Sequence, residues 1–68
     1  METAKIVGAN LKDARKSKGY TQKEVAALLR MTQQQYSRFE TGKFELNYDQ
    51  ILLLCEIYEI TPNELFER

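Results

Sequence analysis

The residues of this chain best suited to chemistry are polar side chains spaced three and four positions apart between Thr32 and Glu40. If this stretch is a helix that buries Tyr36 and Phe39, four polar side chains share its outward face: Gln33, Gln34, Ser37 and Arg38. Glutamine can form two hydrogen bonds with adenine and arginine with guanine, while a small serine lets a helix backbone approach a groove wall. The pattern is therefore typical either of a face that reads base edges or of an ordinary solvated helix face.

Two short helices joined by a tight turn must position this face. Residues 22–40 carry two apolar stripes of helical spacing, which meet at a break around Arg30 and Met31. The first stripe consists of Val25, Ala26, Leu28 and Leu29, and the second consists of the two aromatic residues. The start of each helix has the residues of a capping box, namely Thr21 with Glu24 and Thr32 with Gln35.

Three further helices give an all-α chain of five short helices. Residues 3–18 predict a first helix that ends at Gly19. Asn47 can cap a helix over residues 48–60, and Thr61 with Pro62 can begin a last short one. The helix over residues 48–60 has more apolar residues than one stripe needs. We expect one face of Tyr48, Ile51, Leu52, Cys55 and Tyr58, which Leu54, Ile57 and Ile60 widen.

These motifs resemble the helix-turn-helix of the Cro and phage-repressor type, also called the xenobiotic-response-element family. The segment NLKDARKSKGYTQKEVAALL is similar to the family's first two helices, and the resemblance continues through ETGK to TPNELF. It implies a single lambda-repressor-like DNA-binding domain over residues 1–68, which regulates transcription by binding specific sequences of double-stranded DNA. The family usually has glycine in the turn, where the backbone tends to be left-handed, and this chain has Arg30 there.

The resemblance also assigns roles in DNA binding. The helix that follows Thr32 would enter the major groove, with Gln33, Gln34, Ser37 and Arg38 at the base edges. Arg38 would reach either a guanine or a phosphate. Contacts to phosphates are expected from Gln22, Thr32, Gln35 and Lys43. In the loop that contains Lys43, we expect backbone donors to matter most, and Phe44 either packs under the loop or lies exposed against a sugar.

One expected ion pair would join the first helix to the end of the DNA-reading helix. In the family an arginine at the position of Arg15 pairs with an acid at the position of Glu40. A partly buried pair of this kind would fasten the two helices together. The alternative is that Arg15 is an ordinary surface arginine.

Surplus apolar residues near the carboxyl end indicate a homodimer. The expected interface is Leu53, Ile57, Leu65 and Phe66. A two-fold axis would place two recognition helices about 34 Å apart, one turn of duplex, on a pseudo-palindromic operator.

Composition narrows the class of protein. The chain has 68 residues, one Cys and no His, which excludes an internal disulfide and zinc sites built from several Cys and His. We expect no metal, no cofactor, no membrane association, no small-molecule effector and a cytoplasmic location. No acid and base pair stands out for catalysis, so we do not expect an enzyme.

The charge distribution favours DNA although the net charge is zero. Residues 1–43 carry nine Lys and Arg against four Asp and Glu, and residues 44–68 carry one against six, giving +5 and −5. A basic amino-terminal part would face the phosphates while the acidic part faces away. An antitoxin-like protein-interaction module remains the alternative function on the same fold.

Overall fold

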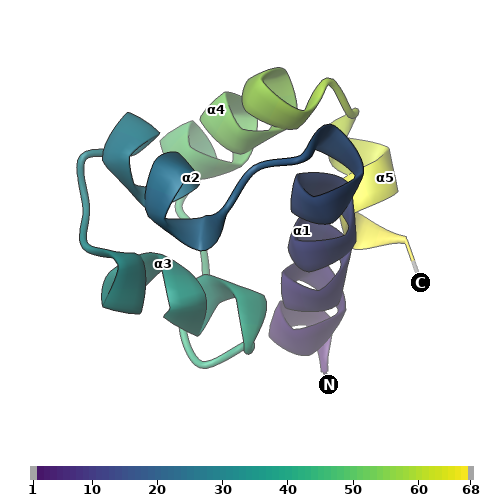
Figure 1. Ribbon diagram of the computed structural model, residues 1–68. Coiled ribbons are helices and arrows are strands. Elements are labelled where there is room, and N and C mark those ends of the chain that lie inside the picture. The colour runs from purple at the N-terminus through teal and green to yellow at the C-terminus, as the bar shows by residue number, and fades with distance from the viewer. Residues whose placement is uncertain (1, 68) are drawn as a thin grey trace.

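The computed structural model describes residues 2–67, which form five α-helices: α1 Thr3–Lys18, α2 Gln22–Leu28, α3 Gln33–Glu40, α4 Tyr48–Tyr58 and α5 Pro62–Phe66. These residues form no strand, and the predicted all-α architecture is confirmed. Figure 1 shows α2 and α3 together on one side of the molecule, with α5 beside α1 on the other. Within residues 2–67 no helix has the length and apolar character needed to cross a membrane.

The helices from α2 to α5 begin at the side-chain caps that the sequence predicts. Thr21, Thr32, Asn47 and Thr61 each accept a hydrogen bond from the backbone N–H three residues later. The side chain at that later position accepts from the N–H of the cap residue in return, which completes a capping box at each start. At the other end of α1, Gly19 adopts the left-handed conformation (φ +79°) that closes the helix.

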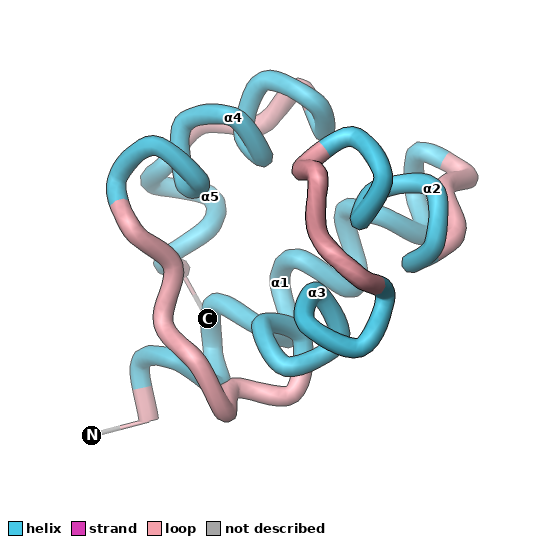
Figure 2. The backbone as a smooth tube through the Cα atoms, turned by 90° about the vertical axis from the view of Figure 1, so that its left-hand side faces the viewer, coloured by secondary structure: helices cyan, strands magenta, loops and turns pink. Residues whose placement is uncertain are grey.

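The buried core draws on all five helices, and its members are Val7, Leu11, Val25, Ala26, Tyr36, Phe39, Leu54, Cys55, Tyr58 and Leu65. Close approach of α1 to the end of α3 depends on Gly8, because a Cβ there would lie 2.5 Å from the carbonyl oxygens of Phe39 and Glu40. In Figure 2 the loop after α3 passes beside the first turn of α1, where Gly42 lies against Lys5. Backbone contacts therefore fix the carboxyl end of α3 on α1.

The inward face of α4 is shifted from the predicted one toward Leu54, which was expected only to widen it. Tyr48 and Leu52 are 85% and 61% exposed, whereas Leu54 is fully buried. The stripe that packs inward is Ile51, Leu54, Cys55 and Tyr58. Residues 51–55 are all apolar, so two stripes of helical spacing compete, and the fit against the other helices decides between them. The helix also ends at Tyr58 rather than at residue 60, because Glu59 turns left-handed (φ +56°).

Two other apolar residues lie elsewhere than expected. Leu28, predicted to be part of the buried stripe, is exposed, because the buried side of α2 is centred on Val25 and Ala26. Leu65, predicted to lie at a dimer interface, is fully buried within the chain's own core. Asn10 Nδ2 donates to the Leu65 carbonyl oxygen at 2.8 Å and holds α5 on α1. Leu65 has no surface left for a partner subunit, and its assignment to an interface was wrong.

Candidate nucleic-acid interface

A left-handed residue makes the turn between α2 and α3. Arg30 has φ +58°, although it is not glycine. The backbone N–H of Arg30 donates to Ala27 O, and that of Met31 donates to Ala26 O at 3.0 Å, which closes the end of α2. The chain then reaches Thr32, which caps α3. The turn for which the resemblance implies glycine is thus formed here by Arg30, at some conformational cost.

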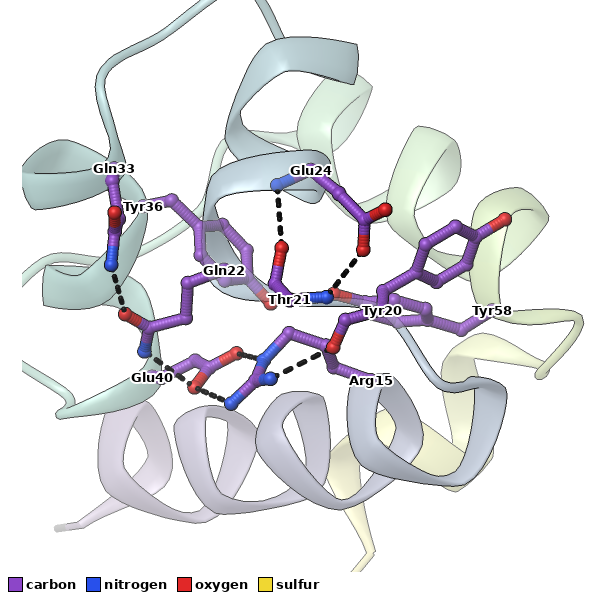
Figure 3. A network of polar contacts seen from close by, with 9 residues as sticks. All are labelled: Arg15, Tyr20, Thr21, Gln22, Glu24, Gln33, Tyr36, Glu40 and Tyr58. Atoms are coloured by element: carbon purple, nitrogen blue, oxygen red, sulfur yellow. Dashed lines mark hydrogen bonds and ion pairs between the residues drawn. The ribbon is translucent and has the colours of Figure 1, made fainter.

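A buried ion pair fastens α1 to the end of α3. Arg15 Nε donates to Glu40 Oε2 at 2.7 Å and Arg15 Nη2 donates to Glu40 Oε1 at 3.2 Å. Arg15 Nη1 also donates to the carbonyl oxygen of Tyr20 at 2.9 Å, in the connection between α1 and α2. Arg15 and Glu40 are only 9% and 7% exposed. One guanidinium therefore links α1, the connection that leads into α2, and the end of α3, as Figure 3 shows.

The same carboxylate begins a chain of hydrogen bonds that reaches the surface. Gln22 Nε2 donates to Glu40 Oε1 at 3.0 Å, and Gln33 Nε2 approaches Gln22 Oε1 at 3.5 Å. Figure 3 shows these side chains in a continuous line from the buried pair to the start of α3. The last contact is long and exposed, so Gln33 can exchange it readily for another partner.

The charges of the pair are favoured by its surroundings. Burial alone would raise the pKa of Glu40, but the hydrogen bonds to its carboxylate, the largest of them from Arg15, outweigh burial together with the positive charge of Arg15 and lower that pKa below its ordinary value. The hydrogen bond to Glu40 raises the pKa of Arg15. Beside the pair, the hydroxyls of Tyr36 and Tyr58 lie 2.6 Å apart, and burial raises the pKa of Tyr58 to about 12. At neutral pH a charged pair and a neutral tyrosine pair therefore anchor α3.

The predicted reading face divides into two parts. At the amino-terminal end of α3, Gln33 and Gln34 are exposed. Further along, Ser37 and Arg38 are only partly exposed, and the guanidinium carbon of Arg38 lies 5.4 Å from the centre of the Phe44 ring. The first part is open to a ligand, whereas the arginine of the second part is already in contact with a neighbour.

The predicted phosphate contacts have different surroundings. Thr32 and Gln35 are exposed, although each side chain also takes part in the cap of α3. Lys43 is exposed in the loop after α3. The loop's backbone does not fit the expected role as main donor, because the N–H groups of Lys43 and Phe44 donate to Arg38 O at 2.9 and 3.3 Å. At this point the loop therefore offers the Lys43 side chain rather than its amides.

Two relationships were missed in the sequence. Gln22 was assigned to a phosphate, but the structure also makes it the link between Glu40 and Gln33. The stacking of Arg38 on Phe44 was not foreseen either, because the loop between them has no periodic pattern that would indicate where its side chains lie. Gln22 and Glu40 are 18 residues apart in the sequence, so their hydrogen bond becomes evident only once the fold brings α2 and α3 together.

Two helices, α2 and α3, are joined by a left-handed turn, and α3 is capped at its start and held to α1 at its end. This arrangement defines a helix-turn-helix. A family model described as helix-turn-helix matches residues 11–65. The chain belongs to this family, whose Cro and phage-repressor type members are DNA-binding transcription regulators.

Individual relatives agree with this family. The chain is 35% identical over 62 residues to an SPbeta prophage-derived uncharacterized HTH-type transcriptional regulator, YonR, of Bacillus subtilis (strain 168). The match covers 91% of this chain and 57% of that protein, so the chain spans little more than half of the relative's length.

Solved structures show the same architecture. The restriction-modification controller protein C.AhdI from Aeromonas hydrophila superposes with a TM-score of 0.81 at 28% identity, over 93% of this chain and 91% of that one. The BldD DNA-binding domain of S. venezulae gives 0.82 at 23% identity, over 98% and 100% of the two chains. The second similarity is one of fold alone.

Proposed function

We propose that this chain is a single DNA-binding domain that recognises a specific sequence of double-stranded DNA and regulates transcription as a homodimer. The observation that carries the proposal is the exposed amino-terminal end of α3, where Gln33 and Gln34 stand free of the core while the carboxyl end of the helix is pinned to α1. A rigid helix with an open polar end can enter the major groove without losing its support.

Base edges are the proposed targets of Gln33, Gln34, Ser37 and Arg38. A glutamine amide both donates and accepts, which matches the N6 and N7 positions of adenine in the major groove. The contact of Gln33 with Gln22 is compatible with this assignment, since at 3.5 Å and exposed it can be exchanged for a base edge. Gln22, Thr32, Gln35 and Lys43 would hold the phosphates on either side and set the register of the helix.

Selection of bound duplexes from a random pool, at a stated salt concentration, tests this function. We expect enrichment of a motif with two related half-sites about one helical turn apart. Recovery of duplexes without any shared sequence would contradict specific recognition.

Lys43→Ala separates phosphate contacts from base contacts. Loss of one phosphate contact should weaken binding to selected and scrambled duplexes alike and reduce the salt dependence by about one unit. Lys12→Ala removes the same charge from an exposed position on α1 outside the helix-turn-helix and serves as the matched control. Equal effects of the two variants would contradict a specific role for Lys43.

The homodimer is proposed through α4 and the end of α5. Leu53 is exposed and Ile57, one turn later, is partly exposed; Phe66 is also exposed. Leu52, exposed on α4 although predicted to be buried, adds apolar area beside Leu53. Apolar side chains in this number on one small chain are typical of a surface that another subunit covers.

Light scattering across a concentration series tests the dimer. Leu53→Lys should shift the protein toward monomer, while Lys12→Glu, a charge change at an exposed position of α1, should not. A wild-type monomer at tens of micromolar, both free and bound to DNA, would contradict the dimer; an intact dimer in Leu53→Lys would contradict only this interface.

A further inference from the structure

Arg38 is less exposed than its place on α3 implies. The residue lies on the side of the helix opposite Tyr36 and Phe39, which are buried. Even so, its side chain is only partly exposed, because the guanidinium lies over the ring of Phe44 with 5.4 Å between the Arg38 Cζ atom and the ring centre. This distance is within the range of a cation–π contact.

Phe44 is held in place, although it is 52% exposed. Its backbone N–H donates to the carbonyl oxygen of Arg38 at 3.3 Å, so the loop folds back onto the same residue that its ring contacts. Phe44 is also one of the residues around a mainly apolar pocket of about 210 Å³, together with Val7, Phe39, Leu46, Ile51 and Phe66. Phe44 is thus attached to the core side of the molecule and offers a ring face to Arg38.

We propose that Phe44 is a positioning residue for DNA binding, which orders the guanidinium of Arg38 before the duplex arrives. The inference rests on the proposed function and adds a residue that does not itself need to touch DNA. A free arginine must give up many rotamers when it binds, whereas an arginine already stacked on a ring loses fewer. A contact of this kind at a partly exposed site corresponds to about a two- to fivefold difference in affinity.

A double-mutant cycle on DNA affinity tests the proposal. Phe44→Leu keeps an apolar side chain against the pocket and removes the ring face, whereas Phe44→Tyr keeps the face. Phe44→Leu should weaken binding to the selected duplex about two- to fivefold, and Phe44→Tyr should bind that duplex as tightly as the wild-type protein. In an Arg38→Ala background, Phe44→Leu should have almost no further effect, because the side chain that it positions is gone.

Lys43→Ala provides the matched background, since Lys43 is in the same loop and has no part in the stack. There, Phe44→Leu should keep its full effect. Equal effects of Phe44→Leu with and without Arg38, or wild-type affinity of Phe44→Leu, would overturn the inference. Urea unfolding of each variant separates an effect on DNA binding from one on stability.

The outcomes also separate this inference from the proposed function. If the wild-type protein prefers no duplex, the proposed function fails first. If it does prefer one and Gln34→Ala reduces that preference, while Arg38 and Phe44 act independently, only the positioning role fails.

Discussion

Replacement of Glu40 by glutamine should remove a large part of the stability of this protein. The carboxylate accepts two hydrogen bonds from Arg15, at 2.7 and 3.2 Å, and one from Gln22 at 3.0 Å. The Glu40→Gln change leaves the guanidinium of Arg15 buried without its counter-charge. Loss of one member of a buried pair typically costs about 3–5 kcal/mol.

That cost is large compared with the stability of a small domain. Domains are stable by about 5–15 kcal/mol, and one of 68 residues buries only a modest core. Since 1 kcal/mol shifts Tm by about 4–8 °C in domains of this size, a loss of 3–5 kcal/mol lowers Tm by roughly 12–40 °C. Glu40→Gln should therefore melt at a clearly lower temperature than the wild-type protein.

Urea unfolding of Glu40→Gln, Arg15→Met and the double variant measures the coupling. The double variant should lose clearly less than the sum of the single losses, because it leaves no buried charge unpaired. Glu59→Gln breaks the exposed ion pair between Lys18 and Glu59 and is the matched control, with little change expected. Additive single effects would refute the pair as the anchor of α3.

Three further predictions concern Glu40, Gly8 and Arg30. Because the pKa of Glu40 is lower in the folded than in the unfolded state, its contribution is present at neutral pH and is lost as the pH falls below about 4; the stability gap between wild type and Glu40→Gln should narrow there in urea titrations. Gly8→Ala should destabilise the protein by at least about 1–3 kcal/mol in thermal unfolding, since its Cβ would lie 2.5 Å from two backbone oxygens, whereas Ala9→Ser at the exposed neighbouring position should change little. Arg30→Gly should relieve the left-handed strain and be neutral or stabilising by up to about 1 kcal/mol, whereas Arg30→Ala keeps a Cβ and should bring no such gain. A clear loss of stability in Arg30→Gly would contradict this.

Helix starts and the identity of the family could be predicted from the sequence because both depend on local chemistry. Thr21, Thr32, Asn47 and Thr61 each cap a helix through hydrogen bonds that span only three residues. The ion pair between Arg15 and Glu40 was predicted from the family resemblance, and the structure contains it.

Packing preferences among similar residues could not be predicted in the same way. In α4 the apolar run permits two stripes, and burial of Leu54 rather than Leu52 follows from how α4 meets the other helices. Leu65 is equally apolar whether it faces the core or a partner, so its sequence context does not distinguish the two. The contact of Arg38 with Phe44 depends on the path of an irregular loop, which has no periodicity to analyse.

The most direct test of the account is the preference of Gln33→Ala and Gln34→Ala for the selected duplex over a scrambled one, measured by binding isotherms across a salt series. The two side chains are exposed at the open end of α3, and their loss should leave the fold intact. Gln34→Ala should lose about 1–3 kcal/mol on the selected duplex and almost nothing on the scrambled one. If both variants keep the wild-type ratio of the two affinities, this end of α3 does not read the sequence.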